Sequence, residues 1–176
     1  MRKSIGLAFG FSLLFILLMN FLFFIIANAI EGSIEAQFNA IAANPYYLCY
    51  RLAQPMGHFP WDIVGWINSD VYNNGDNLRF GLMLVAIIGG AIIAGIAGGS
   101  IKNAIIGWVI TCIILIILIG IAAFNVQGVI YLITGSYTTS FEDAMIWIVL
   151  RGIFNTIIYG LLTVLVALIA GKSKSY

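Results

Sequence analysis

The chain has 176 residues, of which 62% are hydrophobic and only 9% are charged, and its mean hydropathy is +1.06. These values lie well outside the range of soluble globular proteins and leave room for one bundle of about four membrane spans with a modest element outside the membrane. The net charge of +1 is not concentrated in a basic patch with interleaved aromatic residues, so we expect no nucleic-acid partner.

The charges are segregated along the chain in a way that indicates a membrane topology. All acidic residues fall in two segments, residues 31–79 and 125–143, whereas every lysine lies outside them. Four apolar runs separate the acidic from the basic segments. Because short basic loops stay in the cytoplasm, we predict a multi-pass protein of the plasma membrane with both termini and the loop around Lys102 in the cytoplasm.

The first apolar run, residues 5–30, is long enough to cross a membrane with some tilt. It is longer than the apolar region of about 7–15 residues in a cleaved signal peptide, so we expect a retained signal-anchor helix. Asn20 lies near its middle, with no charged partner implied by the sequence. An amide at that depth favours a hydrogen bond to a neighbouring helix.

The first outer loop, residues 31–79, is unusually aromatic for a solvated segment. Pro45 and Pro60 each stand where a short helix can begin. We expect about two or three such helices to lie on the bilayer with their rings at headgroup depth. The alternative is a cap that docks on another subunit. In either case Trp61 and Trp66 are candidate contacts to lipid or to a partner.

The first outer loop has few residues that could bind a metal ion. His58 is the only histidine of the chain, and Asp62 is the nearest carboxylate to it, whereas a zinc site needs about three or four ligands. The turn-like stretch 70–77 has Tyr72 and Gly81 where an EF-hand needs an oxygen ligand and a glutamate. We therefore predict no metal and no cofactor, and we interpret His58 as a structural residue.

The second and third apolar runs, residues 80–99 and 104–124, are separated only by residues 100–103, which predicts a tight antiparallel hairpin. The second run is rich in small residues, which let helix backbones approach closely. Because they occupy more than one face, we expect this helix to pack against two neighbours, within its own bundle or at a subunit interface or pore wall. The residues assigned to this packing are Gly90, Ala94, Gly95, Gly98 and Gly99.

The fourth run, residues 144–170, follows the second outer loop, residues 125–143, and carries two patterns. A small and polar stripe, which we assign to helix packing, consists of Thr156, Gly160 and Thr163. Beside it, one turn apart, lie three candidate contacts to a partner or to lipid, Arg151, Asn155 and Tyr159. We expect Arg151 to reach the outer headgroups or a carboxylate, since a charge left in hydrocarbon costs at least about 2.5–3.5 kcal/mol.

Residue types that carry chemistry are missing from the spans. No acidic residue lies in any apolar run, whereas ion-coupled carriers usually need a carboxylate at membrane depth. Cys49 in the outer loop and Cys112 in the third run cannot meet across the membrane, and no Cys-x-x-Cys motif occurs. The motifs of membrane proteases are also absent. We therefore predict that the protein is not an enzyme.

Two resemblances accompany these patterns. The stretch of residues 87–104 resembles the hairpin of small, glycine-rich, multi-span archaeal membrane proteins of unknown function. The layout of four spans, inner termini, a large first outer loop and Arg79 opening the second span looks like that of claudins. Claudins staple that loop with a cysteine pair, and this loop has only Cys49. Neither resemblance assigns a functional residue.

The predicted fold is an all-α integral membrane protein: a four-helix transmembrane bundle in a single domain, residues 1–176, with a short-helix extracytoplasmic loop. For function we predict a non-catalytic structural or accessory subunit of a membrane assembly, in contact with lipids and with other subunits or copies of itself. The alternative is a homo-oligomeric channel or facilitator for a small solute or ion, whose path is lined by the stripe in the fourth run.

The topology is testable by thiol labelling in intact cells. We expect single cysteines at Ser4, Asn103 and Ser175 to resist an impermeant reagent, and one at Gly75 to react, because only the acidic segments face outward. Labelling at Asn103 together with protection at Gly75 would reverse the predicted orientation.

Overall fold

The computed structural model describes residues 4–60, 74–134 and 139–172, with the backbone alone for 74–80 and 172. Four of its helices are long and apolar enough to cross a membrane, which confirms the predicted all-α membrane bundle. These long helices are α1 (Ile5–Ile30), α5 (Asn74–Gly98), α6 (Ile101–Asn125) and α8 (Phe141–Lys172). The shorter helices in the described residues are α2 (Ile34–Ala43), α3 (Tyr46–Ala53), the 3₁₀ helix η1 (Gln54–Gly57) and α7 (Gln127–Thr134).

Serine caps set where two of the long helices begin. Ser100 Oγ accepts a hydrogen bond from the Asn103 N–H at 3.3 Å, so α6 starts earlier than predicted, at Ile101. Ser140 Oγ accepts from the Asp143 N–H at 3.1 Å and donates to the Asp143 carboxylate at 2.9 Å, which starts α8 inside the predicted loop. Each cap satisfies a backbone N–H that the first helical turn leaves unpaired.

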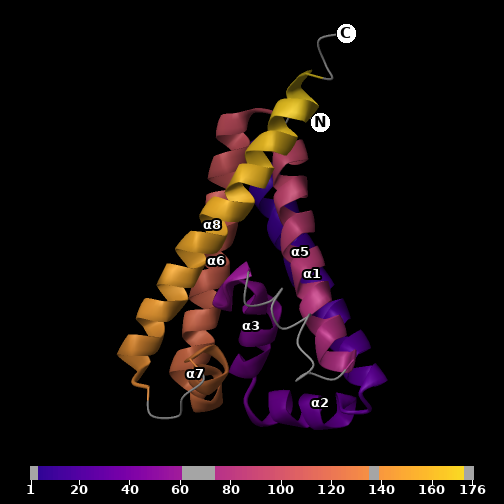
Figure 1. Ribbon diagram of the computed structural model, residues 1–176, viewed down its shortest axis with the longest axis vertical. Coiled ribbons are helices and arrows are strands. Elements are labelled where there is room, and N and C mark those ends of the chain that lie inside the picture. The colour runs from indigo at the N-terminus through magenta and orange to yellow at the C-terminus, as the bar shows by residue number, and fades with distance from the viewer. Residues whose placement is uncertain (1–3, 61–73, 135–138, 173–176) are drawn as a thin grey trace.

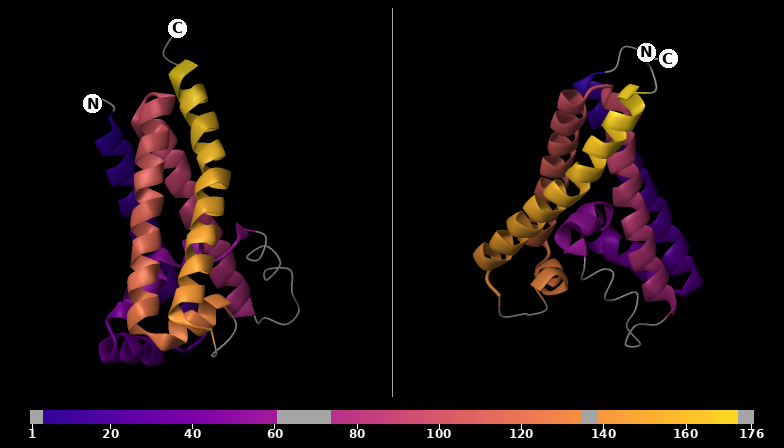
Figure 2. Two further views of the ribbon diagram at one scale, coloured as in Figure 1. Left: turned by 90° about the vertical axis from the view of Figure 1, so that its left-hand side faces the viewer. Right: turned by 45° about the horizontal axis from the view of Figure 1, so that its top comes forward.

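The long helices form two pairs that diverge from a common end (Figure 1). α1 packs along α5, and α6 packs along α8. The narrow end, where the pairs meet, holds the α5–α6 turn and the ends of α1 and α8 that lead to the chain termini. The wide end holds α2 and α7, as Figure 2 shows from two further directions. This placement of both termini at one end agrees with an even number of crossings.

Close approach of the helices near the narrow end depends on glycine. A Cβ added to Gly95 of α5 would lie 2.8 Å from the Thr163 carbonyl oxygen of α8. A Cβ added to Gly107 of α6 would lie 2.5 Å from the Ala8 Cβ of α1. Neither distance leaves room for a side chain, so these backbones approach as closely as small-residue packing in membranes allows.

At the wide end, α3 and η1 fill the space between the two helix pairs (Figure 1). We call residues 46–58 the inserted segment. Its side chains Tyr50, Ala53 and Met56 are buried in a core shared with residues of α1, α5, α6 and α8. The prediction that the short helices lie on the bilayer surface is therefore wrong for α3, whereas α2 buries no residue. The short helix predicted after Pro60 lies outside the described residues.

The inserted segment is buried because the diverging pairs would otherwise lack neighbours on their inner faces. A gap between helices forfeits the dispersion contacts of the side chains that line it. In lipid, where apolar burial gives little net gain, such contacts are a main source of helix association. The inserted segment supplies such contacts to both pairs, because α3 packs on α1 and α6 and η1 packs on α5, α6 and α8.

Because α5 and α8 approach closely at Gly95, adding one methyl group there should destabilise the protein. Gly95→Ala should lower the free energy of unfolding by about 1–3 kcal/mol, because the added Cβ meets a backbone oxygen that cannot move aside by rotamer change. Thermal unfolding in detergent measures this. Gly10→Ala in α1 is the matched control, since no atom lies within 4 Å of its added Cβ. Equal stability of the two variants would contradict close packing of α5 on α8.

Candidate functional site

The end of the inserted segment presents backbone carbonyl groups in the interior of the bundle. Asn155, near the middle of α8, donates from Nδ2 to the carbonyl oxygens of His58 at 2.9 Å and of Pro55 and Met56 at 3.4 Å. Its side chain is fully buried. Water cannot satisfy carbonyl groups at this depth, so an amide from the protein takes that role.

Arg151, one turn before Asn155, acts in the same way. Its Nη1 donates to the Gly57 carbonyl oxygen at 3.1 Å and to the Ile133 carbonyl oxygen. The guanidinium also lies 5.4 Å from the Phe59 ring centroid and 5.7 Å from that of Trp147. These contacts connect Arg151 to the inserted segment and to α7. That it also reaches headgroups or a carboxylate stays a prediction.

Two further side chains complete the attachment of the inserted segment. Asn20, from the middle of α1, donates from Nδ2 to the Leu52 carbonyl oxygen at 2.7 Å. The Tyr50 hydroxyl lies 3.3 Å from His58 Nε2, and both side chains are buried. Burial, and after it the positive charge of Arg151, lowers the pKa of His58 to about 3, so His58 is neutral at physiological pH.

The stripe predicted on α8 faces the chain's own helices. Thr163 Oγ1 donates to the Ala91 carbonyl oxygen of α5 at 3.1 Å. The Trp108 indole of α6 donates to the Thr156 carbonyl oxygen at 3.1 Å, and its ring lies 3.5 Å from a Cβ added at Gly160. Tyr159, from the neighbouring row, is buried in the same core. These residues therefore contact α5 and α6.

The small residues predicted on α5 meet more neighbours than expected. A Cβ on Gly90 would lie 2.4 Å from the Ile16 side chain of α1, and one on Gly98 would lie 2.6 Å from the Ala104 backbone of α6. Ala94 is fully buried, and Gly99 ends the helix with a φ of +70°, which glycine adopts without strain. With Gly95 against α8, the helix packs on all three of the other long helices, α1, α6 and α8.

Trp61 and Trp66, the remaining predicted contacts to lipid or to a partner, lie outside the described residues.

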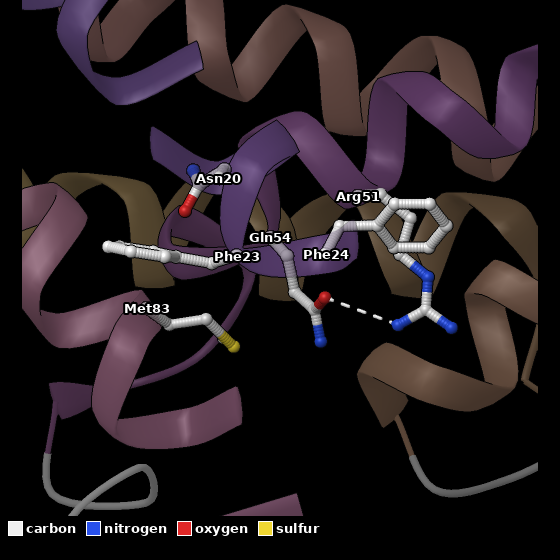
Figure 3. A pocket seen from close by; sticks show the side chains of 6 residues that line it. All are labelled: Asn20, Phe23, Phe24, Arg51, Gln54 and Met83. Carbon is white, nitrogen blue, oxygen red and sulfur yellow. Dashed lines mark hydrogen bonds between the residues drawn. The ribbon is translucent and has the colours of Figure 1, made fainter. Parts of the chain in front are cut away.

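Arg51 of α3 is a polar site that the sequence reasoning missed. Its guanidinium donates to Gln54 Oε1 at 3.4 Å (Figure 3), to Gln37 Oε1 at 3.1 Å and to the Tyr47 hydroxyl. A small recess beside it, about 20 Å³ in volume, has room for one water molecule. The side chains that line it are Asn20, Phe23, Phe24, Arg51, Gln54 and Met83. The spacing of Tyr47 and Arg51, one helical turn apart, was the available signal.

The polar side chains of this site bond parts of the chain to one another. The span residues Asn20, Asn155 and Arg151 donate to backbone carbonyls of the same chain. Among the described residues, no three His, Cys, Asp or Glu side chains gather in one place. These contacts hold the end of α3, the 3₁₀ helix η1 and His58 between the spans.

No known protein family, curated protein or solved structure matches the chain. The resemblances to glycine-rich archaeal proteins and to claudins therefore stay predictions. The functional proposal rests on the geometry of the inserted segment.

The amide of Asn155 gives a direct test of this attachment. Asn155→Leu keeps the approximate volume and leaves carbonyl oxygens without a donor, so the free energy of unfolding should fall by about 1–3 kcal/mol. The half-buried Cys49 of α3 should also react faster with a maleimide, because the segment loosens. Asn125→Leu is the control, since its exposed amide bonds only to its own helix. Unchanged Cys49 reactivity in Asn155→Leu would contradict the role of the amide.

Proposed function

We propose that the protein is a non-catalytic structural subunit of a membrane protein assembly, placed in the plasma membrane with both termini in the cytoplasm. The proposal rests on what the polar residues of the spans bind. Asn20, Arg151 and Asn155 donate to the chain's own inserted segment. A transporter or enzyme would direct such groups at a solute path or a substrate.

The rigid wide end gives this role a physical basis. The inserted segment ties α1, α6 and α8 together there, so whatever lies on it is held in a fixed position. α2 exposes most of its surface, and the Tyr46 side chain at the start of α3 is 46% exposed. Aromatic side chains on a rigid support bind partners with little loss of conformational freedom.

The alternative of a homo-oligomeric channel loses its main support. It depended on Thr156, Gly160 and Thr163 facing a solute path, and these residues contact α5 and α6 of the same chain. We therefore propose one function and keep the channel as an outcome of the test.

Native mass spectrometry of the tagged chain, released from its own membrane in mild detergent, tests the proposal. We expect co-purification with at least one different membrane chain in a fixed ratio. A symmetric ring of copies would support the channel instead, and a lone monomer would contradict both.

A pair of variants locates the contact. Tyr46→Ala should lower the recovery of the partner without changing the thermal stability of the chain, because it removes an exposed ring at the wide end. Ile169→Ala is the matched control, since this side chain is 71% exposed near the other end of the bundle. Equal recovery with both variants would remove the wide end as the partner surface.

A further inference from the structure

Arg51 carries a positive charge that no carboxylate of the described residues neutralises. Its three acceptors, Gln37 Oε1, Gln54 Oε1 and the Tyr47 hydroxyl, are neutral. No carboxylate of the described residues is within ion-pair distance of its guanidinium. Arginine stays protonated at any physiological pH, so the charge persists.

The surroundings of the guanidinium are aromatic and partly dry. Its Cζ lies 4.8 Å from the Tyr47 ring centroid, 5.8 Å from that of Phe24 and 5.9 Å from that of Tyr50. The residue is half-buried, and its Nε is buried with no hydrogen-bond acceptor. Rings on several sides lower the local dielectric, which strengthens the attraction of any anion that approaches.

Arg51 lies close to the end of α1 at the wide end of the bundle, and the ends of membrane-crossing helices lie near the lipid headgroups. Phe24, which it contacts, lies in the last two turns of α1, about 9 Å from the end of that helix at 1.5 Å per residue. From there toward the middle of the membrane, α1 exposes large apolar side chains: Leu14, Leu18, Phe21 and Leu22. A ligand with a charged head and apolar tails fits such a surface.

We propose that Arg51 binds the phosphate group of an anionic phospholipid in the leaflet at the wide end of the bundle. The phosphate supplies a negative charge, and one of its oxygens accepts from the Nη1 N–H that the bond to Gln54 leaves free. The recess beside Gln54, about 20 Å³ in volume, is too small for a phosphate and has room for a single water. The headgroup therefore binds at the exposed edge of the guanidinium.

Thermal unfolding of the full chain in neutral detergent, with and without phosphatidylglycerol, tests the proposal. Saturating lipid should raise the midpoint temperature of the wild type by about 3–5 °C. Diacylglycerol with the same acyl chains should not, because it lacks the phosphate. Arg51→Gln should abolish the rise, and Arg51→Lys should keep only part of it, since an ammonium keeps the charge but has fewer N–H donors than a guanidinium to bind the protein and the phosphate together. Lys102→Gln removes the same charge from an exposed site at the narrow end and should keep the full rise.

Other results would contradict either the ligand or the site that we propose. An equal rise with inorganic phosphate identifies free phosphate as the ligand and removes the lipid. A full rise in Arg51→Gln removes the site. Native mass spectrometry of the wild type counts retained phosphatidylglycerol and does not depend on how the variants fold; absence of retained lipid overturns the proposal. If neither phosphate source binds and Arg51→Gln loses a co-purifying membrane chain, the counterion is a carboxylate of a protein partner.

Discussion

Backbone carbonyl groups that leave the helical pattern inside a bilayer need donors from the protein, because lipid offers none. The inserted segment meets this constraint through amides and a guanidinium on the flanking helices, Asn20, Asn155 and Arg151. Since Asn20 and Asn155 lie near the middles of α1 and α8, they set how deeply the segment sits. That depth in turn determines how far the two helix pairs diverge at the wide end.

The two ends of the bundle are therefore held by different physical means. Near the narrow end, Gly95 and Gly107 bring helix backbones into direct contact, so the pairs meet without intervening side chains. At the wide end, the large side chains of Tyr50 and Met56 keep the pairs apart while polar bonds fix the backbone that carries them. A taper of this kind exposes a broad, rigid surface on only one side of the membrane.

The four spans were predictable from the sequence because each depends on one uninterrupted apolar run. The inserted segment was not, since aromatic residues such as Tyr50 suit an interfacial helix equally well. Its donors are distant in sequence: Asn20 is 32 positions from Leu52, and Asn155 is 97 positions from His58. A hydrogen bond from Asn20 to a neighbouring helix was predicted, and its acceptor Leu52 belongs to such a helix, α3, but the sequence did not identify the acceptor. Arg51 escaped notice because neutral partners leave no charge pattern in the sequence.

The position of the donors in the chain has a consequence for biogenesis. Arg151 and Asn155 belong to α8, the last of the four spans to leave the ribosome, whereas the carbonyl groups of residues 55–58 that they bind are made about a hundred residues earlier. Until α8 enters the bilayer, η1 lacks these donors and has no stable place between the helix pairs. A nascent chain that has inserted only three helices therefore has an unfinished interior, in which the carbonyl groups of residues 55–58 lack the donors that α8 later supplies.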